Sequence, residues 1–224
     1  MLQKIKQTGL RYSFALAFNR IVPEWLFRCR RFVVYQLSTQ KEITANPDVD
    51  ASWCETAADL EAVEQVTYFR RETCPGDAQA CQAKLKGELV GGFWSATKQF
   101  TESELGINYQ LDAGQVWLFA AVIDKQFRNA KAYSSILKFI LPALAEQGHV
   151  HQIVAVNPDN GGSNYVHKRQ SFRSPGTVLA IRFLKTTLCF CFGEIKSDRM
   201  IAWNSTKQPI VLKIKTIDEP NSSQ

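Results

Sequence analysis

The run of eight consecutive apolar residues from Val116 to Ile123 constrains the fold more than any other feature of the sequence. It is far shorter than the ~20 apolar residues that a membrane-spanning helix needs, and it has the length of a strand that is buried on both faces. After the polar connection Asp124 to Arg128, one face of a predicted helix carries Tyr133, Ile136, Leu137, Ile140, Leu141 and Leu144. A second apolar run, Ile153 to Val156, completes a strand, helix, strand unit. Its strands are expected to be parallel, because such crossovers are right-handed in nearly all proteins.

Three residues are expected to shape this helix. Asn129 is placed to cap its start, since asparagine side chains accept hydrogen bonds from the first helical amides. Gly148 is placed to end it, because glycine adopts the left-handed conformation that follows many helices. Pro142 lies inside the helix and lacks an amide hydrogen, so we expect a kink there.

The flanking sequence predicts further strands and helices. Arg31 to Ser38 is rich in residues that favour strands, and the stretch from Ala57 to Arg71 has helical spacing. The segments 78–85 and 89–97 flank a Lys-Gly-Glu turn and predict an antiparallel hairpin, whereas 98–114 is polar and predicted to be a loop. The fold class predicted from this order is α/β, with a mixed, partly antiparallel twisted sheet flanked by helices.

We expect three regions along the chain. Residues 1–50 form a basic helix and strand extension, 51–185 form the central domain, and 186–224 form a β-rich extension with a frayed tail. A hydrophobic content of 45% with 21% charged residues is that of a globular protein, which argues against disorder and against a membrane bundle.

The net charge of +6 and the pI near 9.0 indicate anionic partners. Residues 1–31 hold seven Lys and Arg residues against one acid, Glu24, and apolar residues recur there at helical spacing from Leu10 to Ile21. This pattern is typical of a basic amphipathic helix, which either lies on an anionic membrane surface or packs its apolar side on the core. Nucleic acid is not an expected partner, because the basic residues are not interleaved with a recognised motif.

The cysteines indicate the cellular compartment of the protein, and the histidines indicate whether it binds a metal ion. The six cysteines form no CxxC pair, and no signal peptide is recognisable, so we expect a cytoplasmic protein with reduced thiols. A peripheral position at the inner face of the membrane is the alternative, through residues 1–31. The spacing of His149 and His151 matches no zinc pattern, and no metal is expected.

The order of these elements resembles that of the GNAT superfamily of acyl-CoA-dependent N-acyltransferases, over residues 51–185. In that family a buried strand is followed by an Arg-Gly-x-Gly-x-Gly loop and a helix whose N-terminus holds the CoA pyrophosphate. Arg128 matches the family arginine, while the glycine positions fall on Asn129, Lys131 and Tyr133. The resemblance assigns acyl-CoA binding to a loop consisting of Arg128, Asn129, Ala130, Lys131, Ala132 and Tyr133.

A second family pattern, Asn-x-x-Ser/Ala-x-x-Leu-Tyr-x-x-x-Gly-Phe, matches downstream at Asn160, Ser163, Val166, His167, Ser171 and Phe172. The resemblance places Asn160 and Ser163 at the CoA and puts His167 where the family has a tyrosine that acts as general acid. As an imidazolium, His167 is suited to protonate the departing thiolate; the alternative is a solvent-facing residue. Tyr165 is out of register. The resemblance also places the oxyanion contact at a backbone N–H near Val122 or Ile123.

These assignments imply an enzyme that transfers an acetyl or other acyl group from acyl-CoA to an amine of a small-molecule acceptor. Two alternatives stay open. One is a longer-chain or carrier-protein-dependent acyltransferase at the membrane surface, and the other is a degenerate GNAT domain that binds without catalysis. No general base is evident, because the strand from Val116 to Ile123 carries no carboxylate.

Overall fold

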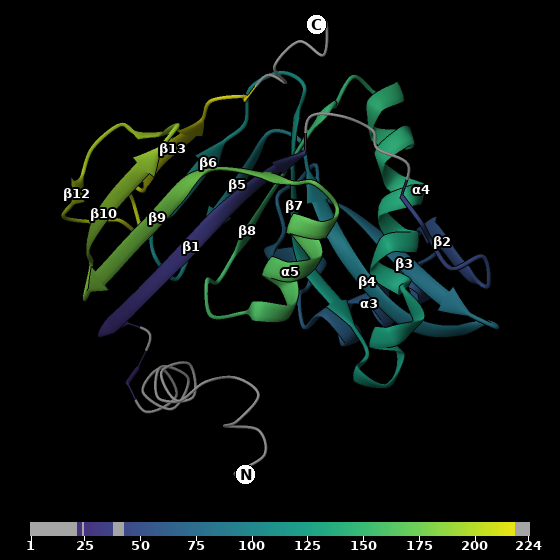
Figure 1. The fold of residues 1–224 in the computed structure, drawn as a ribbon. Helices are drawn as coiled ribbons and strands as arrows, with labels where there is room; N and C mark the ends of the chain where they lie inside the picture. The colour runs from purple at the N-terminus through teal and green to yellow at the C-terminus, as the bar shows by residue number, and fades with distance from the viewer. Residues whose placement is uncertain (1–21, 24, 38–42, 218–224) are drawn as a thin grey trace, which may run out of the picture. The chain divides into compact units, whose positions relative to one another are not determined.

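The computed structural model of the chain describes residues 22–23, 25–37 and 43–217 (Figure 1). The amphipathic pattern between Leu10 and Ile21 lies outside these residues. The described residues form two compact units. Unit 1 takes them from 22–36, 100–110 and 155–217, and unit 2 from 37, 43–99 and 111–154.

Unit 2 contains the strand, helix, strand unit. Its strands lie in the order β8, β7, β4, β3, β2, and only the β7–β8 pair is parallel. The strands are β2 Val49–Trp53, β3 Gln79–Leu85, β4 Glu88–Ala96, β7 Gln115–Ile123 and β8 His151–Val156, of which residues up to 154 belong to unit 2. The helices are α3 Ala57–Thr67 and α4 Ala132–Glu146, with the 3₁₀ helices η1 Arg71–Thr73 and η2 Lys125–Ala130. The predicted hairpin and the predicted parallel pair are both confirmed.

Helices cover both faces of the unit 2 sheet. Trp94 on β4 donates from Nε1 to Thr67 Oγ1 of α3 over 3.1 Å. Cys81, Phe93 and Trp53 are paired in adjacent strands and face the other way, where the Trp53 ring contacts Phe139 of α4. The sheet is therefore buried on both faces, as the apolar run in β7 predicts.

Unit 1 contains two sheets and one helix. One sheet has the order β12, β10, β9, β1 and is antiparallel throughout. The other has the order β11, β13, β6, β5, with β13 and β6 parallel. Their bounds are β1 Phe27–Leu37, β9 Arg173–Phe183, β10 Thr186–Gly193, β12 Ile201–Ala202, β5 Gln99–Glu102, β6 Ile107–Gln110, β11 Ile195–Ser197 and β13 Ile210–Ile214; the helix is α5 Gly161–Arg169.

The structure confirms the predicted fold class, a mixed and partly antiparallel sheet flanked by helices, and corrects two local predictions. Residues 98–114 are not a loop, because β5 and β6 lie within them. Asn129 does not cap α4: the chain stays in η2 through Ala130, and α4 begins at Ala132. Gly148 does follow the end of α4, with a left-handed φ of 86°. Among the described residues, no helix has the length and apolar character needed to cross a membrane.

Candidate functional site

β7 is bulged at its centre. Gly92 pairs with Val122 and Trp94 with Phe119, so two residues of β7 oppose one of β4, and Ala120 has a left-handed φ of 50°. Such a bulge bends a strand and increases its twist. The β7–β8 ladder runs from Gln115 only to Leu118, which pairs with Val154, and β7 continues beyond it to Ile123. The parallel pairing described in unit 2 thus ends next to the bulge.

The direction of the backbone amides at the end of β7 follows from one hydrogen bond. The amide of Asp124 donates to the carbonyl of Val90 on β4 over 2.9 Å. Because successive residues of a strand direct their amides to opposite edges, the amide of Ile123 points away from β4, toward the edge of β7 that pairs with β8. Of the two residues predicted for the oxyanion contact, Val122 and Ile123, only Ile123 has its amide on this edge.

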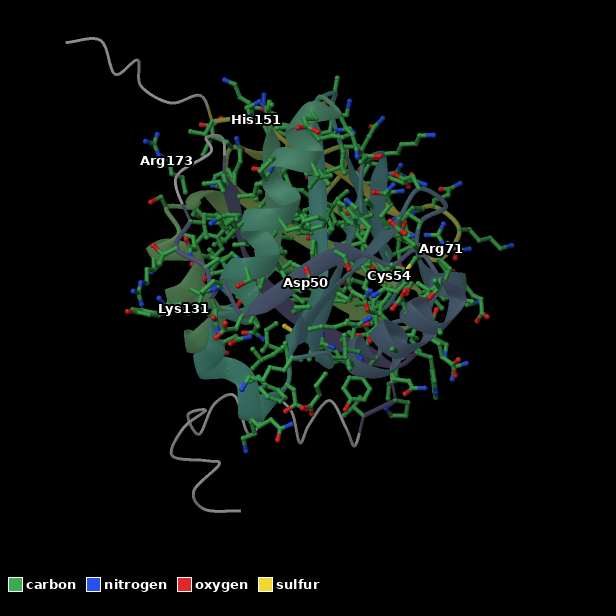
Figure 2. The ribbon with its side chains drawn as sticks, turned by 90° about the vertical axis from the view of Figure 1, so that its right-hand side faces the viewer. Asp50, Cys54, Arg71, Lys131, His151 and Arg173 are labelled. Carbon is green, nitrogen blue, oxygen red and sulfur yellow. The ribbon has the colours of Figure 1, made fainter. Side chains whose placement is uncertain are left out.

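η2 and the start of α4 hold the loop predicted for acyl-CoA binding. Asp124 caps η2 by accepting from the amide of Gln126 over 3.0 Å. The side chains of Lys125, Arg128 and Lys131 are exposed, and Lys131 lies at the periphery of the protein in Figure 2. Three exposed cations therefore lie in η2 and at the cap of α4, a helix N-terminus whose backbone amides also favour anions.

The cap residue of α4 is Lys131, which makes no side-chain capping bond. Its φ of 54° lies in the left-handed region that glycine favours. Lys131 is also one of the three positions at which the resemblance expects glycine. The backbone at Lys131 thus has a conformation that glycine adopts without strain and lysine rarely adopts. Ala132 is buried at the first turn of α4 and Tyr133 is half-buried.

In unit 1, the start of α5 is a network of asparagine side chains. Asn160 is the cap of α5 and accepts from the amide of Ser163 over 3.2 Å. Asn164 donates to the carbonyls of Asn157, Pro158 and Asn160, and its Oδ1 accepts from the hydroxyl of Tyr35 over 2.8 Å. The side-chain oxygen of Asn160 is thus used for capping, and Asn164 fixes the loop before α5.

His167 on α5 is 3% exposed, so the solvent-facing alternative is wrong. Its ring stacks on Tyr35 at 5.6 Å between centroids and meets Phe172 edge-on at 5.0 Å. Nδ1 lies 2.7 Å from the carbonyl oxygen of Ser163, an acceptor, so Nδ1 carries a proton. Burial lowers the pKa of His167, an effect that the bond to Ser163 partly offsets. Neutral imidazole with its proton on Nδ1 is the form favoured near neutral pH.

Of two neighbours of His167, Ser171 belongs to the downstream pattern and Tyr165 does not. Ser171 takes the place of the family glycine and has a left-handed φ of 66°, so the backbone again keeps the conformation that glycine favours. Tyr165 is 63% exposed and lies on a different side of α5 from His167, as its register predicts.

The two groups of predicted site residues fall in different units: the residues from Val122 to Tyr133 in unit 2, and Asn160, Ser163 and His167 in unit 1. Sequence reasoning missed Tyr35, Asn164 and the bulge at Ala120. Tyr35 and Asn164 meet only through folding, and no periodicity signals an alanine with a left-handed φ. In the described residues, no group of three or more His, Cys, Asp or Glu residues is placed to hold a metal ion.

No family model matches the sequence, and no curated protein matches it. Among solved structures, the chain is similar to a GNAT-family protein from Novosphingobium aromaticivorans, described as an acetyltransferase, with a TM-score of 0.50 and 10% identity. The match covers 69% of this chain and 63% of that protein.

GCN5-related N-acetyltransferases from Sphaerobacter thermophilus and Kribbella flavida give TM-scores of 0.47 and 0.43 at 15% and 14% identity. These matches cover 75% of this chain in each case, and 56% and 63% of the two proteins. The chain thus spans less than two thirds of the length of each of these proteins. At such identities the likeness concerns the fold, and the fold of this chain is that of the GNAT acyl-CoA N-acyltransferases.

Proposed function

We propose that the chain is an N-acyltransferase that takes an acyl group, most simply acetyl, from acyl-CoA and transfers it to the amine of a small-molecule acceptor. The observation that carries this proposal is the end of β7. β7 is bulged at Ala120, and its pairing with β8 ends at Leu118. Beyond these points, the amide of Ile123 is directed away from β4. An amide so placed is a preorganised donor for an oxyanion.

The reaction forms a C–N bond and breaks the C–S bond of a thioester. The neutral amine attacks the carbonyl carbon, and the carbonyl oxygen becomes an oxyanion, for which the Ile123 amide is the proposed donor. Collapse of this intermediate expels the CoA thiolate, and the proton released by the amine neutralises it. Exposed cations at Lys125, Arg128 and Lys131, together with the N-terminus of α4, support a role in holding the CoA pyrophosphate.

The role of His167 as general acid stays a prediction. An acid must hold a proton at the atom that faces the thiolate, whereas a neutral ring protonated on Nδ1 has an unprotonated Nε2. This observation favours a second candidate function, a GNAT domain that binds acyl-CoA without turnover. The third candidate, a longer-chain or carrier-protein-dependent acyltransferase, is tested by comparing turnover with different acyl donors.

Calorimetry with acetyl-CoA and CoA at low salt, followed by a thiol-release assay across a panel of amines, separates these functions. Binding with turnover supports the transferase, and binding without turnover supports the second candidate. A lack of binding to acetyl-CoA, longer acyl-CoA and CoA alike would remove both. Replacing acetyl-CoA by a series of longer acyl donors identifies the preferred chain length.

His167→Ala tests the acid role. If His167 protonates the thiolate, the variant loses turnover while CoA affinity stays near that of the wild type. Because the ring also packs on Tyr35, thermal unfolding of each variant is measured in parallel, and His167→Gln serves as the less disruptive variant. Unchanged turnover in both variants would take His167 out of the mechanism.

A further inference from the structure

One face of the antiparallel sheet in unit 1 is apolar and, away from Tyr35, lacks a buried residue. We call it the open face. It consists of residues 27, 29, 31 and 33 of β1, the odd-numbered residues 177–183 of β9, the even-numbered residues 186–192 of β10, and Ile201 of β12. The strand register places them in rows, as in Cys29, Ile181, Leu188 and Ile201. Directly paired residues share one face of a sheet.

The two faces of this sheet differ in burial. On the opposite face Val178, Ala180, Thr187 and Cys189 are buried, and Thr187 donates to the carbonyl of Leu105, between β5 and β6. On the open face every residue is half-buried or exposed. The next residue of β1 on this side, Tyr35, is 3% exposed and stacks on His167 of α5. Among the described residues of unit 1, α5 therefore covers this side of the sheet at Tyr35, beyond the end of the open face.

The open face is unusually apolar for a solvent-facing sheet. Phe183 and Phe192 are each 57% exposed and Ile201 is 43% exposed. Met200 and Trp203, which flank β12, are 57% and 78% exposed. An antiparallel sheet that faces water normally alternates apolar and polar residues, and a contiguous apolar patch of this kind marks an interaction surface.

The net charge of unit 1 distinguishes between two kinds of partner for the open face, a second copy of the chain and an anionic surface. The described residues of unit 1 hold thirteen Lys and Arg against five Asp and Glu, a net charge of +8, whereas those of unit 2 carry −3. The open face itself contains one charged residue, Arg31, and exposed cations border it at Lys185 and Arg199. A second copy would bring together two surfaces of the same sign and bury Arg31, so the charge favours an anionic partner.

We propose that the open face docks on an anionic lipid bilayer, with Phe183 and Phe192 inserted at the boundary between headgroups and acyl chains and with Arg31 and Lys185 at the lipid phosphates. Aromatic side chains favour this boundary, and long basic side chains reach the phosphates while their stems stay in apolar surroundings. Basic residues near an anionic leaflet add electrostatic attraction. The inference is independent of the proposed acyltransferase function, because it uses none of the predicted site residues.

Vesicle flotation with the full-length protein tests the proposal. Vesicles of phosphatidylcholine with phosphatidylglycerol are expected to carry the protein to the top of the gradient, and vesicles of phosphatidylcholine alone are not. The double variant Phe183→Ser, Phe192→Ser should weaken partitioning about tenfold or more, since less apolar surface enters the lipid. Tyr68→Ser, at an exposed aromatic residue of unit 2 that is not part of the open face, is the matched control and should bind as the wild type does.

Charge is tested in the same assay. Arg31→Glu should reduce partitioning into anionic vesicles, whereas Lys207→Glu, an exposed position off the open face, should reduce it less. Retention of binding by the double variant, together with its loss in Phe14→Ser, Phe18→Ser, would overturn the proposal in favour of the N-terminal segment. Light scattering that shows a dimer dissociated by the double variant, with vesicle binding absent, would overturn it in favour of a second copy.

A measurement on the wild-type protein keeps the proposal testable if a variant unfolds. Cys29 is an exposed thiol on the open face, and Cys74 is a half-buried thiol of unit 2. Anionic vesicles should slow the alkylation of Cys29 by a water-soluble maleimide and leave Cys74 unchanged, as followed by peptide mass spectrometry. Equal rates at Cys29 with and without anionic vesicles would refute docking through this face.

Discussion

At the scale of single residues, Lys131 and Ser171 stand where the GNAT resemblance expects glycine. Both keep the left-handed backbone, with φ of 54° and 66°. A residue with a Cβ is strained there by roughly 1–2 kcal/mol relative to its ordinary conformation. Replacing either residue by glycine would relieve this strain in the folded state. Glycine would also increase the conformational entropy of the unfolded chain, which lowers the free energy of unfolding and opposes the gain.

Lys131→Gly is expected to leave the free energy of unfolding unchanged or to raise it by up to ~1 kcal/mol, because relief of strain opposes the unfolded-state entropy. Lys138→Gly makes the same substitution inside α4 and should lower the unfolding free energy by about 1 kcal/mol. Urea denaturation of the two variants measures both values. If both lose the same stability, Lys131 is not strained in solution.

Glu102 on β5 predicts a pH dependence of stability. Burial, and then the neighbouring Glu104, raise the pKa of Glu102 from 4.5 to about 7, against the opposing effect of Arg30. The folded state thus binds a proton more tightly than the unfolded state, so this group stabilises the protein at low pH. That contribution is lost as the pH rises from the unfolded pKa through the folded one.

Glu102→Gln removes this titration. Compared with the wild type, the variant should gain about 1–3 kcal/mol in unfolding free energy at about pH 8 and no such gain at about pH 4.5. Urea denaturation at the two pH values gives the difference. A gain of equal size at both would mean that Glu102 acts through packing and not through its charge.

At the scale of elements, two glycines let β4 approach its neighbours. A Cβ on Gly91 would lie 2.7 Å from the carbonyl oxygen of Val122 on β7, and a Cβ on Gly92 would lie 2.9 Å from Val63 of α3. The β3–β4 ladder also shifts register beside them, between Ala83 and Lys84. Glycine inside a strand often marks a bulge or a close backbone approach, and β4 shows both.

Gly91→Ala should displace the end of β7 that carries the Ile123 amide. We expect a loss of about 1–3 kcal/mol in unfolding free energy from overpacking and, if the proposed function holds, a larger proportional loss of turnover than of CoA affinity. Gly76→Ala, where a Cβ would meet nothing within 4 Å, is the matched control. Wild-type turnover in Gly91→Ala would separate the end of β7 from the chemistry.

The elements that the sequence predicts well are those with long periodic patterns. β7, α4 and β8 follow directly from apolar spacing because each is packed on the unit 2 core over most of its length. β5 and β6 have four residues each, too few for alternation to stand out from a polar loop.

The site is less predictable than these elements, because its geometry depends on contacts between distant parts of the sequence. Burial of His167 comes from the ring of Tyr35, far away along the chain. Because η2 extends through Ala130, α4 begins later than the sequence predicts, and Asn129 is not its cap. The division into residues 1–50, 51–185 and 186–224 stays a prediction.

At the scale of the whole molecule, the net charge of +6 is distributed unevenly, with an excess of cations in unit 1 and of acids in unit 2. The sequence pI indicates an anionic partner but does not locate it. The compact units show where the excess of cations lies, because unit 1 collects residues from three separate stretches of the chain.

An overall positive charge should speed the encounter with an anionic donor. The association rate constant for CoA is expected to fall about 3–10-fold between low and physiological salt, as screening removes the long-range attraction. Pantetheine, which lacks the phosphates, is the control and should associate at a rate that salt does not change. Stopped-flow measurements give both rates, and equal salt sensitivity of the two ligands would contradict the electrostatic account.

The left-handed residues Lys131 and Ser171 also bear on how such a chain is recognised. A sequence pattern that expects glycine at these positions is not met by lysine and serine, although both residues have a left-handed φ. This is consistent with the absence of a matching family model beside a likeness in fold. Relatives with a left-handed φ at the positions of Lys131 and Ser171, but with other residues there, are recognised by comparing backbone conformations. For such proteins, φ at these two positions is a better guide than residue identity.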